Sequence, residues 1–108
     1  MKITALAAIP FAIPYTKPLR FASGEVHTAR HVLVRVRSDD GVVGVAEAPA
    51  RPFTYGETRE SIVAAVQALF APQVVGMSIL DREAVHAVMD RTVGNPTAKS
   101  AVDMAIWT

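Results

Sequence analysis

The chain has 108 residues, which is enough for one compact domain and too few for two. Apolar residues make up 51% and charged residues 19%, a balance that excludes a disordered chain. The net charge of +1 is too small to hold a nucleic-acid backbone, and no stretch approaches the ~20 consecutive apolar residues of a membrane span. The absence of cysteine excludes disulfides and thiolate catalysis and fits a cytoplasmic location. We therefore predict one globular domain over 1–108, with no nucleic-acid or membrane partner.

Apolar and polar residues alternate along residues 3–15. The apolar residues occupy odd positions: Ile3, Ala5, Ala7, Ile9, Phe11, Ile13 and Tyr15. A period of two predicts a strand with this face on the core, and Pro10 and Pro14 place the strand at a sheet edge or bend it. Residues 16–24 break the alternation, so we expect a loop there.

Residues 26–48 predict two further strands joined by a tight turn. Valine occupies positions 32, 34 and 36, which predicts a strand with one buried face. Ser38-Asp39-Asp40-Gly41 has turn chemistry, with Gly41 supplying a positive φ, and residues 42–48 return as the third strand. The first 48 residues thus predict a three-stranded antiparallel meander.

After a second loop at residues 49–56, the apolar period becomes that of helices. A first helix carries Ile62, Val66, Leu69 and Phe70 on one face, and we expect Pro72 to end it.

A second helix begins at Asp81 as its N-cap and is expected to stop at Gly94. Its apolar stripe consists of Val85, Val88 and Met89. Asn95-Pro96 predicts the start of a third helix. The buried stripe of this third helix would be Ala98, Ala101, Val102, Ala105 and Ile106.

The predicted fold class is α+β, a three-stranded antiparallel meander followed by a three-helix bundle. The third helix has no stop signal at Trp107-Thr108, so we expect it to be truncated and the chain to be a fragment.

The histidines offer little support for a metal site. His27 and His31 lie in a strand pattern, where four residues at ~3.3 Å each place their rings roughly 13 Å apart, too far to share one ion. His86 lies between apolar residues of the second helix and is expected at the surface or boundary.

The charged residues favour structural roles. Asp39 and Asp40 are adjacent carboxylates that could attract a cation, but the glycine that follows makes them turn residues first. For Glu47, just before the second loop, a structural ion pair or hydrogen bond is favoured over general-base duty. The basic stretch has no interleaved aromatic residues and fits a solvated face. It consists of Arg30, Arg35 and Arg37. No set of residues here could run a reaction unaided.

Four segments together match a known pattern. They are the opening strand with Ile13-Pro14, the stretch from Val32 through Asp40-Gly41 to Ala48, the segment Tyr55-Gly56-Glu57-Thr58, and the run A-K-S-A-V-D-M-A-I-W at 98–107. This pattern resembles the N-terminal capping domain of the enolase superfamily, and within it the muconate lactonizing enzyme and mandelate racemase group. The resemblance covers essentially the whole chain, and its last segment is the most specific. The family usually has Asp after the tryptophan, where this chain has Thr108.

The resemblance implies a two-domain enzyme whose (β/α) barrel carries the chemistry. In the family, barrel carboxylates hold one Mg²⁺ or Mn²⁺ and barrel lysines act as bases, so that an enediolate forms next to a substrate carboxylate. The chain itself would bind no metal and hold no catalytic residue. Its implied partners are the barrel of the same protein and a small carboxylate substrate, in a parent enzyme that forms homo-oligomers.

The resemblance also implies that the two predicted loops close over the substrate. Tyr55 is the clearest substrate-binding residue, because the tyrosine before Gly-Glu faces the substrate in the muconate lactonizing pattern. Phe53, Leu19 and Phe21 follow as loop members, with packing against the barrel as the other reading of each. His27, at the trailing edge of the first loop, is left without a role.

Three alternatives stay open for the function. The first hypothesis is the capping domain of a muconate-lactonizing-like cycloisomerase, inactive on its own. Within the family, a racemase, a dipeptide epimerase or an o-succinylbenzoate synthase has the same capping architecture. From another class, a free-standing interaction module could dimerise through an exposed stripe on the third helix. That stripe would consist of Ala101, Val102, Ala105 and Ile106.

Overall fold

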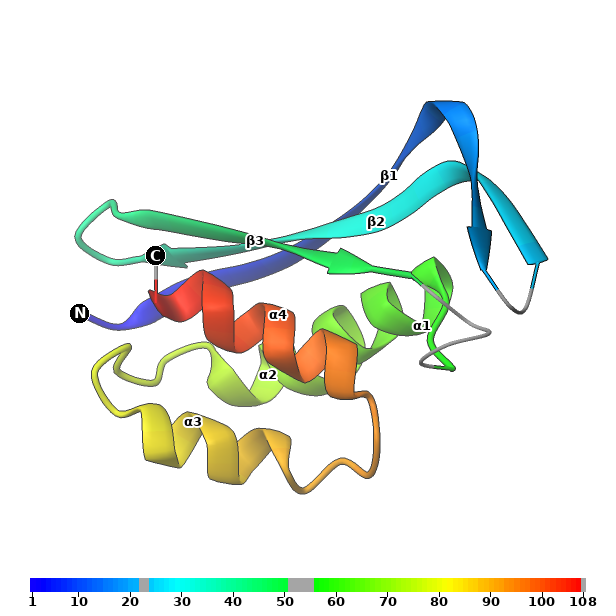
Figure 1. The fold of residues 1–108 in the computed structure, drawn as a ribbon. Helices are drawn as coiled ribbons and strands as arrows, with labels where there is room; N and C mark the ends of the chain where they lie inside the picture. Colours follow the sequence, from blue (N-terminus) through cyan, green and yellow to red (C-terminus); the bar gives the residue numbers. More distant parts are fainter. Residues whose placement is uncertain (22–23, 51–55, 108) are drawn as a thin grey trace.

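The computed structural model describes residues 1–21, 24–50 and 56–107, with side chains described for 1–14, 30–50 and 56–107. Three antiparallel strands form one sheet in the order β1-β2-β3, and the helices cover one of its faces (Figure 1). The strands are β1 (Ile3–Phe21), β2 (Gly24–Ser38) and β3 (Val43–Pro49). The helical elements are α1 (Arg59–Ala64), η1 (Ala65–Phe70), α2 (Ala71–Val74), α3 (Arg82–Met89) and α4 (Pro96–Trp107). The predicted fold class is confirmed.

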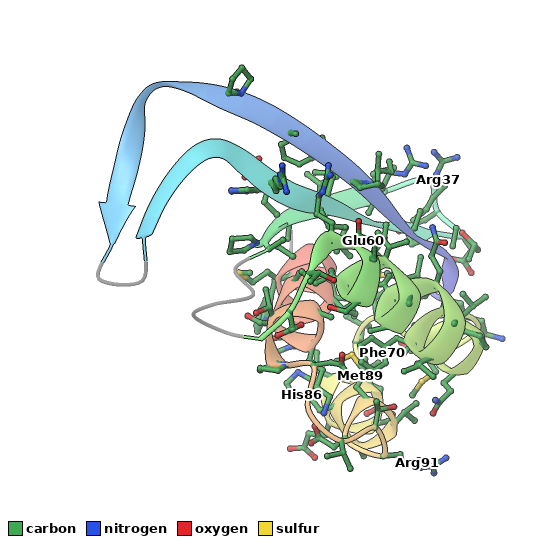
Figure 2. The ribbon with its side chains drawn as sticks, turned by 90° about the vertical axis from the view of Figure 1, so that its right-hand side faces the viewer. Arg37, Glu60, Phe70, His86, Met89 and Arg91 are labelled. Atoms are coloured by element: carbon green, nitrogen blue, oxygen red, sulfur yellow. The ribbon has the colours of Figure 1, made fainter. Side chains whose placement is uncertain are left out.

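The core lies between the sheet and the helices. Strand β2 contributes the predicted valines, which are buried and pair with Ala8, Leu6 and β3 on either side. In Figure 2, Phe70 and Met89 lie among the helices below the sheet. The helical side of the core consists of Ile62, Ala65, Val66, Phe70, Val74, Val85, Met89, Ala98, Ala101, Val102 and Ala105.

The prediction for the buried face of β1 was wrong beyond Ile3. Ile3 pairs with Ser38 and Ala5 pairs with Arg37, so the register shifts at Thr4. Because side chains alternate between faces, one unpaired residue exchanges the faces of everything that follows. Leu6 and Ala8 are therefore buried, whereas Ile9, expected in the core, is 40% exposed.

The predicted loop at residues 16–24 was also wrong. Strand β1 continues to Phe21 and β2 starts at Gly24, with Leu19 paired to Val26 and Phe21 paired to Gly24. The register of the β1–β2 pairing shifts between Pro14 and Leu19, where the alternation of apolar and polar residues breaks. The hairpin bends in its outer part, which extends past the helices (Figure 1). Proline cannot donate to the ladder, which explains an interruption here without an end to the strand.

The first predicted helix does not end at Pro72. It runs through a π-helical segment, η1, into α2, and Pro72 lies in the first turn of α2. The wider π turn also rotates the helix face, so Phe70 is fully buried while Leu69, expected beside it, is 42% exposed.

The second and third helices follow the prediction in most respects. Asp81 is the N-cap of α3 and accepts a hydrogen bond from the Ala84 backbone N–H. However, α3 ends at Met89, and Gly94 lies in the connection to α4. The stripe of α4 packs against β3 and β2, which contradicts the idea of an exposed stripe. Of its members, Ala98, Ala101, Val102 and Ala105 are buried and Ile106 is partly buried.

Candidate functional site

One end of the molecule gathers the segments that the sequence singled out. The turn end of the β1–β2 hairpin, the end of β3 and the first residues of α1 and α4 all lie away from the two termini (Figure 1). The hairpin is the longest feature there and extends past the helices in both views (Figure 2). The described parts of the two predicted loop regions, residues 16–21 and 24 of the first and 49–50 and 56 of the second, thus lie at one end of the fold.

Of the four predicted substrate-binding residues, the structure describes the backbone of two. Leu19 and Phe21 lie on the backbone of β1 near the hairpin turn, and their side chains are outside the described part. Phe53 and Tyr55 lie outside the described residues altogether. His27 lies on β2, also without a described side chain, so its distance from His31 is not tested.

Residues 56–58 lead into α1 through a left-handed glycine and a helix cap. Gly56 has a φ of +75°, in the left-handed region that favours glycine. Thr58 is the N-cap of α1 and forms a capping box with Ser61: the Ser61 N–H donates to Thr58 Oγ1 at 3.1 Å, and the Thr58 N–H donates to Ser61 Oγ at 2.8 Å.

Between these two residues, Glu57 caps a different helix. Its side chain is 4% exposed, and its two carboxylate oxygens accept hydrogen bonds from the backbone N–H groups of Thr97 at 2.8 Å and Ala98 at 3.1 Å. These are amides of the first turn of α4, where a negative charge is also favoured by the helix dipole. A buried carboxylate is costly without such partners, so Glu57 ties the start of α1 to the start of α4.

Asn95, which the sequence predicted as the cap of α4, has another role. Its φ of +56° places it in the left-handed region, and its side-chain amide donates to the Val93 carbonyl at 3.2 Å. The Asn95 carbonyl does accept the first helical hydrogen bond, from Lys99. The side-chain cap comes instead from Glu57, 40 residues earlier in the sequence.

An open cavity of about 290 Å³ lies beside this contact, between the end of β3 and α4. Its lining combines apolar surface with two hydroxyl groups and one carboxylate. The lining residues are Glu47, Pro49, Pro96, Thr97, Ser100 and Met104. Thr97 therefore both lines the cavity and donates to Glu57.

Glu47 and His31 interact on the sheet face turned away from the helices. Oε2 of Glu47 lies 3.3 Å from Nδ1 of His31, and the His31 ring lies 5.7 Å from the Phe11 ring, centroid to centroid. The two groups form an ion pair when His31 is protonated, whereas among the described residues Nδ1 of His31 has no hydrogen-bond partner. Asp39 and Asp40 occupy the turn after β2, as predicted, and accept from the Lys2 N–H and from Ser38 and Val42 respectively.

A second polar cluster joins α3 to α4. Oδ1 of Asp103 lies 2.7 Å from Nε2 of His86 and 3.2 Å from Nη2 of Arg82. Burial raises the pKa of Asp103, but the hydrogen bonds from His86 and Arg82 outweigh it and leave the pKa below its usual value of 3.8. His86 is partly exposed, at the boundary where the sequence placed it.

Among the described residues, no group of three or more His, Cys, Asp or Glu side chains is arranged to hold a metal ion. In the same part of the chain, no helix is long and apolar enough to cross a membrane.

Sequence reasoning missed Glu57 as an individual residue. The only signal was its place between a glycine and a predicted helix start, because nothing local indicates a partner 40 residues away.

Comparison with known proteins places this geometry in a family. The family described as mandelate racemase / muconate lactonizing enzyme, N-terminal domain, matches residues 4–108. The chain is 37% identical over 108 residues to an L-Ala-D/L-Glu epimerase of Bacillus subtilis, covering 99% of this chain and 30% of the epimerase.

Two solved structures show the same architecture. A muconate lactonizing enzyme from Mycobacterium smegmatis, complexed with muconolactone, is 68% identical with a TM-score of 0.96, covering 99% of this chain and 29% of that one. A dipeptide epimerase from Enterococcus faecalis, complexed with Mg and the dipeptide L-Leu-L-Tyr, is 28% identical with a TM-score of 0.94, covering 99% and 30%. The chain thus spans about 30% of the length of these relatives.

Proposed function

Because the chain belongs to the mandelate racemase / muconate lactonizing enzyme N-terminal domain family of the enolase superfamily, we propose that it caps the active site of a muconate-lactonizing-like cycloisomerase. The observation that carries the proposal is the 68% identity, over 99% of this chain, to a muconate lactonizing enzyme complexed with muconolactone. Relatives named for other reactions share far less of the sequence.

The proposed division of labour places the chemistry outside this chain. A (β/α) barrel of the same protein would supply the bases and the metal ligands, and a small carboxylate would be the substrate. Mg²⁺ or Mn²⁺ would stabilise the enediolate that forms in the reaction. The described residues offer no ligand set for such an ion, so its ligands would come from the barrel. A cytoplasmic, homo-oligomeric parent enzyme completes the proposal.

The contribution of this chain is to shape and close the pocket. Tyr55 would face the substrate, and Phe53, Leu19 and Phe21 would present apolar surface from the same end of the fold. Apolar groups over a charged active site exclude water, which strengthens the electrostatic interactions inside it. The end of the β1–β2 hairpin lies at the same end of the fold as the end of β3 and the first residues of α1 and α4 (Figure 1). This placement supports the role, because the hairpin and the connection from β3 to α1 would both reach one pocket.

A dipeptide epimerase is the second candidate. The 37% identity to the Bacillus subtilis epimerase favours it over the racemase and o-succinylbenzoate synthase alternatives. Both reactions begin from a carboxylate-bearing substrate, and the capping domain would differ mainly in the side chains that touch it. The argument for a free-standing dimeric module was an exposed apolar stripe on α4, and that stripe is buried against the chain's own sheet.

The experiment compares substrates on the complete protein that contains this chain. We expect the protein to convert cis,cis-muconate to muconolactone in the presence of Mg²⁺. The conversion is measured as the loss of muconate absorbance. L-Ala-L-Glu is offered in parallel, with epimerisation followed by chiral chromatography. Conversion of the dipeptide alone would replace the cycloisomerase by the epimerase, and sedimentation of the same sample reports the oligomeric state.

A further inference from the structure

The sheet has a second face, on the side away from the helices. In Figure 2, Arg37 projects from the sheet on the side opposite to Phe70 and Met89. Because side chains alternate along each strand and the strands pair in register, every second residue shares this side. We name the described side chains there the outer face. They are Ala5, Ala7, Ile9, Phe11, Ile13, His31, Leu33, Arg35, Arg37, Val43, Val45 and Glu47.

Apolar side chains make up most of the outer face, and several of them are well exposed. The exposed fraction lies between 40% and 58% for Ile9, Ile13, Val43 and Val45. Leu33 on the central strand pairs with Ile9 on one side, so the apolar surface continues from strand to strand. Exposed apolar surface that spans neighbouring strands is typical of an interaction site. The charges on the outer face indicate which partner fits it.

The charged groups of the outer face lie on a diagonal. Arg35 pairs with Val45, and Glu47 occupies the next outward position of the same strand, β3. The side chain of Glu47 is 60% exposed. Among the side chains that the structure describes, none forms an ion pair with Arg35 or Arg37. Within this part of the chain, the outer face thus presents two guanidinium groups without ionic partners beside one accessible carboxylate.

This arrangement is complementary to itself. In a two-fold symmetric dimer, a contact of residue i with residue j is accompanied by the contact of j with i. A two-fold axis that runs between Arg35 and Glu47, parallel to the sheet, brings each arginine opposite the glutamate of the other copy. Leu33 and Val45 form the other diagonal of the same four positions. The axis therefore passes near both, and their side chains contact the corresponding residues of the other copy.

The position of the arginines separates this surface from the proposed pocket. Arg35 and Arg37 lie toward the turn at residues 39–41, at the opposite end of the sheet from the tip of the β1–β2 hairpin (Figure 1). The net charge of +1 and the carboxylate on the outer face disfavour a polyanion as the partner. A second copy matches both signs of charge and covers the apolar groups at the same time.

We propose that the outer face is an interface between two copies of this chain, with Arg35 of each copy paired with Glu47 of the other. The inference rests on the homo-oligomeric parent enzyme of the proposed function and assigns the surface through which two copies meet. The apolar neighbours exclude water from the two ion pairs, and the ion pairs fix the register in which the apolar groups meet.

The test follows the association of the complete protein by sedimentation over a dilution series. Arg35→Glu places two carboxylates opposite each other in both pairs, and Glu47→Arg places two guanidinium groups there. We expect each variant to raise the dissociation constant about 100-fold, because like charges in an interface repel each other. The controls are Glu83→Lys and Arg91→Glu, charge reversals at exposed positions on and beyond α3, and they should leave the association unchanged.

An equimolar mixture of Arg35→Glu with Glu47→Arg is the decisive sample. In a mixed dimer, the carboxylate introduced at position 35 faces the guanidinium introduced at position 47, and the two native residues face each other as well. We expect the mixture to associate within about threefold of the wild type. Mixing does not restore a pair within one chain, so a mixture that associates no better than the separate variants would overturn the inference.

The apolar part of the outer face is tested by Val45→Lys. Its matched control is Leu80→Lys, at an exposed apolar residue outside the outer face. We expect Val45→Lys to weaken the association about tenfold, because two lysines then come close to each other across the axis, and Leu80→Lys to leave it unchanged. Equal effects of the two would contradict the interface. So would charge reversals that lower Tm and leave the association unchanged, since another part of the same protein would then cover this face.

Turnover of cis,cis-muconate by the same samples keeps the inference apart from the proposed function. A wild type that associates, but whose association does not respond to the charge reversals, overturns the inference alone. A monomeric wild type overturns it together with the homo-oligomeric part of the proposed function. Association that depends on Arg35 and Glu47, in a protein that does not convert muconate, supports the interface and counts against the cycloisomerase.

Discussion

Nε2 of His86 on α3 lies 2.7 Å from Oδ1 of Asp103 on α4, which joins the helix farthest from the sheet to the helix packed on it (Figure 1). Arg82 donates to the same oxygen at 3.2 Å. Asp103 thus holds two α3 side chains with one carboxylate, so the attachment of α3 to α4 depends partly on charge.

We predict that Asp103→Asn lowers the free energy of unfolding by about 1 kcal/mol at pH 5, because it weakens two charge-assisted hydrogen bonds at a partly exposed site. The folded pKa of Asp103 lies below its usual value of 3.8, so the unfolded state binds the proton more readily as the pH falls. The contribution is therefore complete above pH 3.8 and lost as the pH falls through the folded pKa.

Urea unfolding at several pH values checks this. The difference between wild type and Asp103→Asn should narrow toward zero below pH 3.8. Glu83→Gln is the control, since Glu83 is an exposed carboxylate in the first turn of the same helix. A difference that stays constant down to pH 2, or one equal to that of Glu83→Gln, would show that the charge of Asp103 does not join the helices.

The guanidinium of Arg82 also stacks on Trp107, with Cζ 3.8 Å from the ring centroid. Trp107 is the only tryptophan of the 108 residues, so it supplies the whole tryptophan fluorescence of residues 1–108. We predict that Arg82→Lys shifts the Trp107 emission and costs about 0.5–1 kcal/mol, because lysine lacks the planar group that stacks and donates together. An emission spectrum identical to that of the wild type would contradict the stacking; Arg91→Lys, at an exposed site beyond α3, is the control.

In the π-helical segment, the neighbours Leu69 and Phe70 differ in burial, so we predict different effects on stability when each is truncated. Phe70→Ala should lower the free energy of unfolding by about 3–5 kcal/mol, since it empties a fully buried site, whereas Leu69→Ala should cost less than about 1 kcal/mol. Chemical denaturation of both variants tests this. Similar losses for the two would mean that Leu69 shares the core face, as a regular α-helix would have it.

Much of the fold follows from patterns in the sequence because those patterns are local. The turn at Asp39–Gly41 and the cap at Asp81 each depend on side chains within four residues of where they act. The buried valines of β2 were predictable for the same reason, since both faces of that strand differ sharply in polarity.

The errors arise where a distant contact decides between local options of equal strength. Both faces of β1 carry apolar residues, so alternation alone does not reveal that the register shift at Thr4 buries Leu6 in place of Ile9. The continuation of the hairpin past Pro14 depends on pairing with β2. Glu57 caps α4 because the fold brings residues 40 positions apart in the sequence into contact. The proposed substrate-facing role of Tyr55 involves groups outside the described residues.

The central claim, that this chain caps a pocket whose reactive groups lie in another part of the protein, is tested most directly by one activity measurement. Residues 1–108 and the complete protein are each incubated with cis,cis-muconate and Mg²⁺, and muconate absorbance is followed. We predict conversion by the complete protein and none by residues 1–108 at equal concentration. Turnover by residues 1–108 alone would contradict the account.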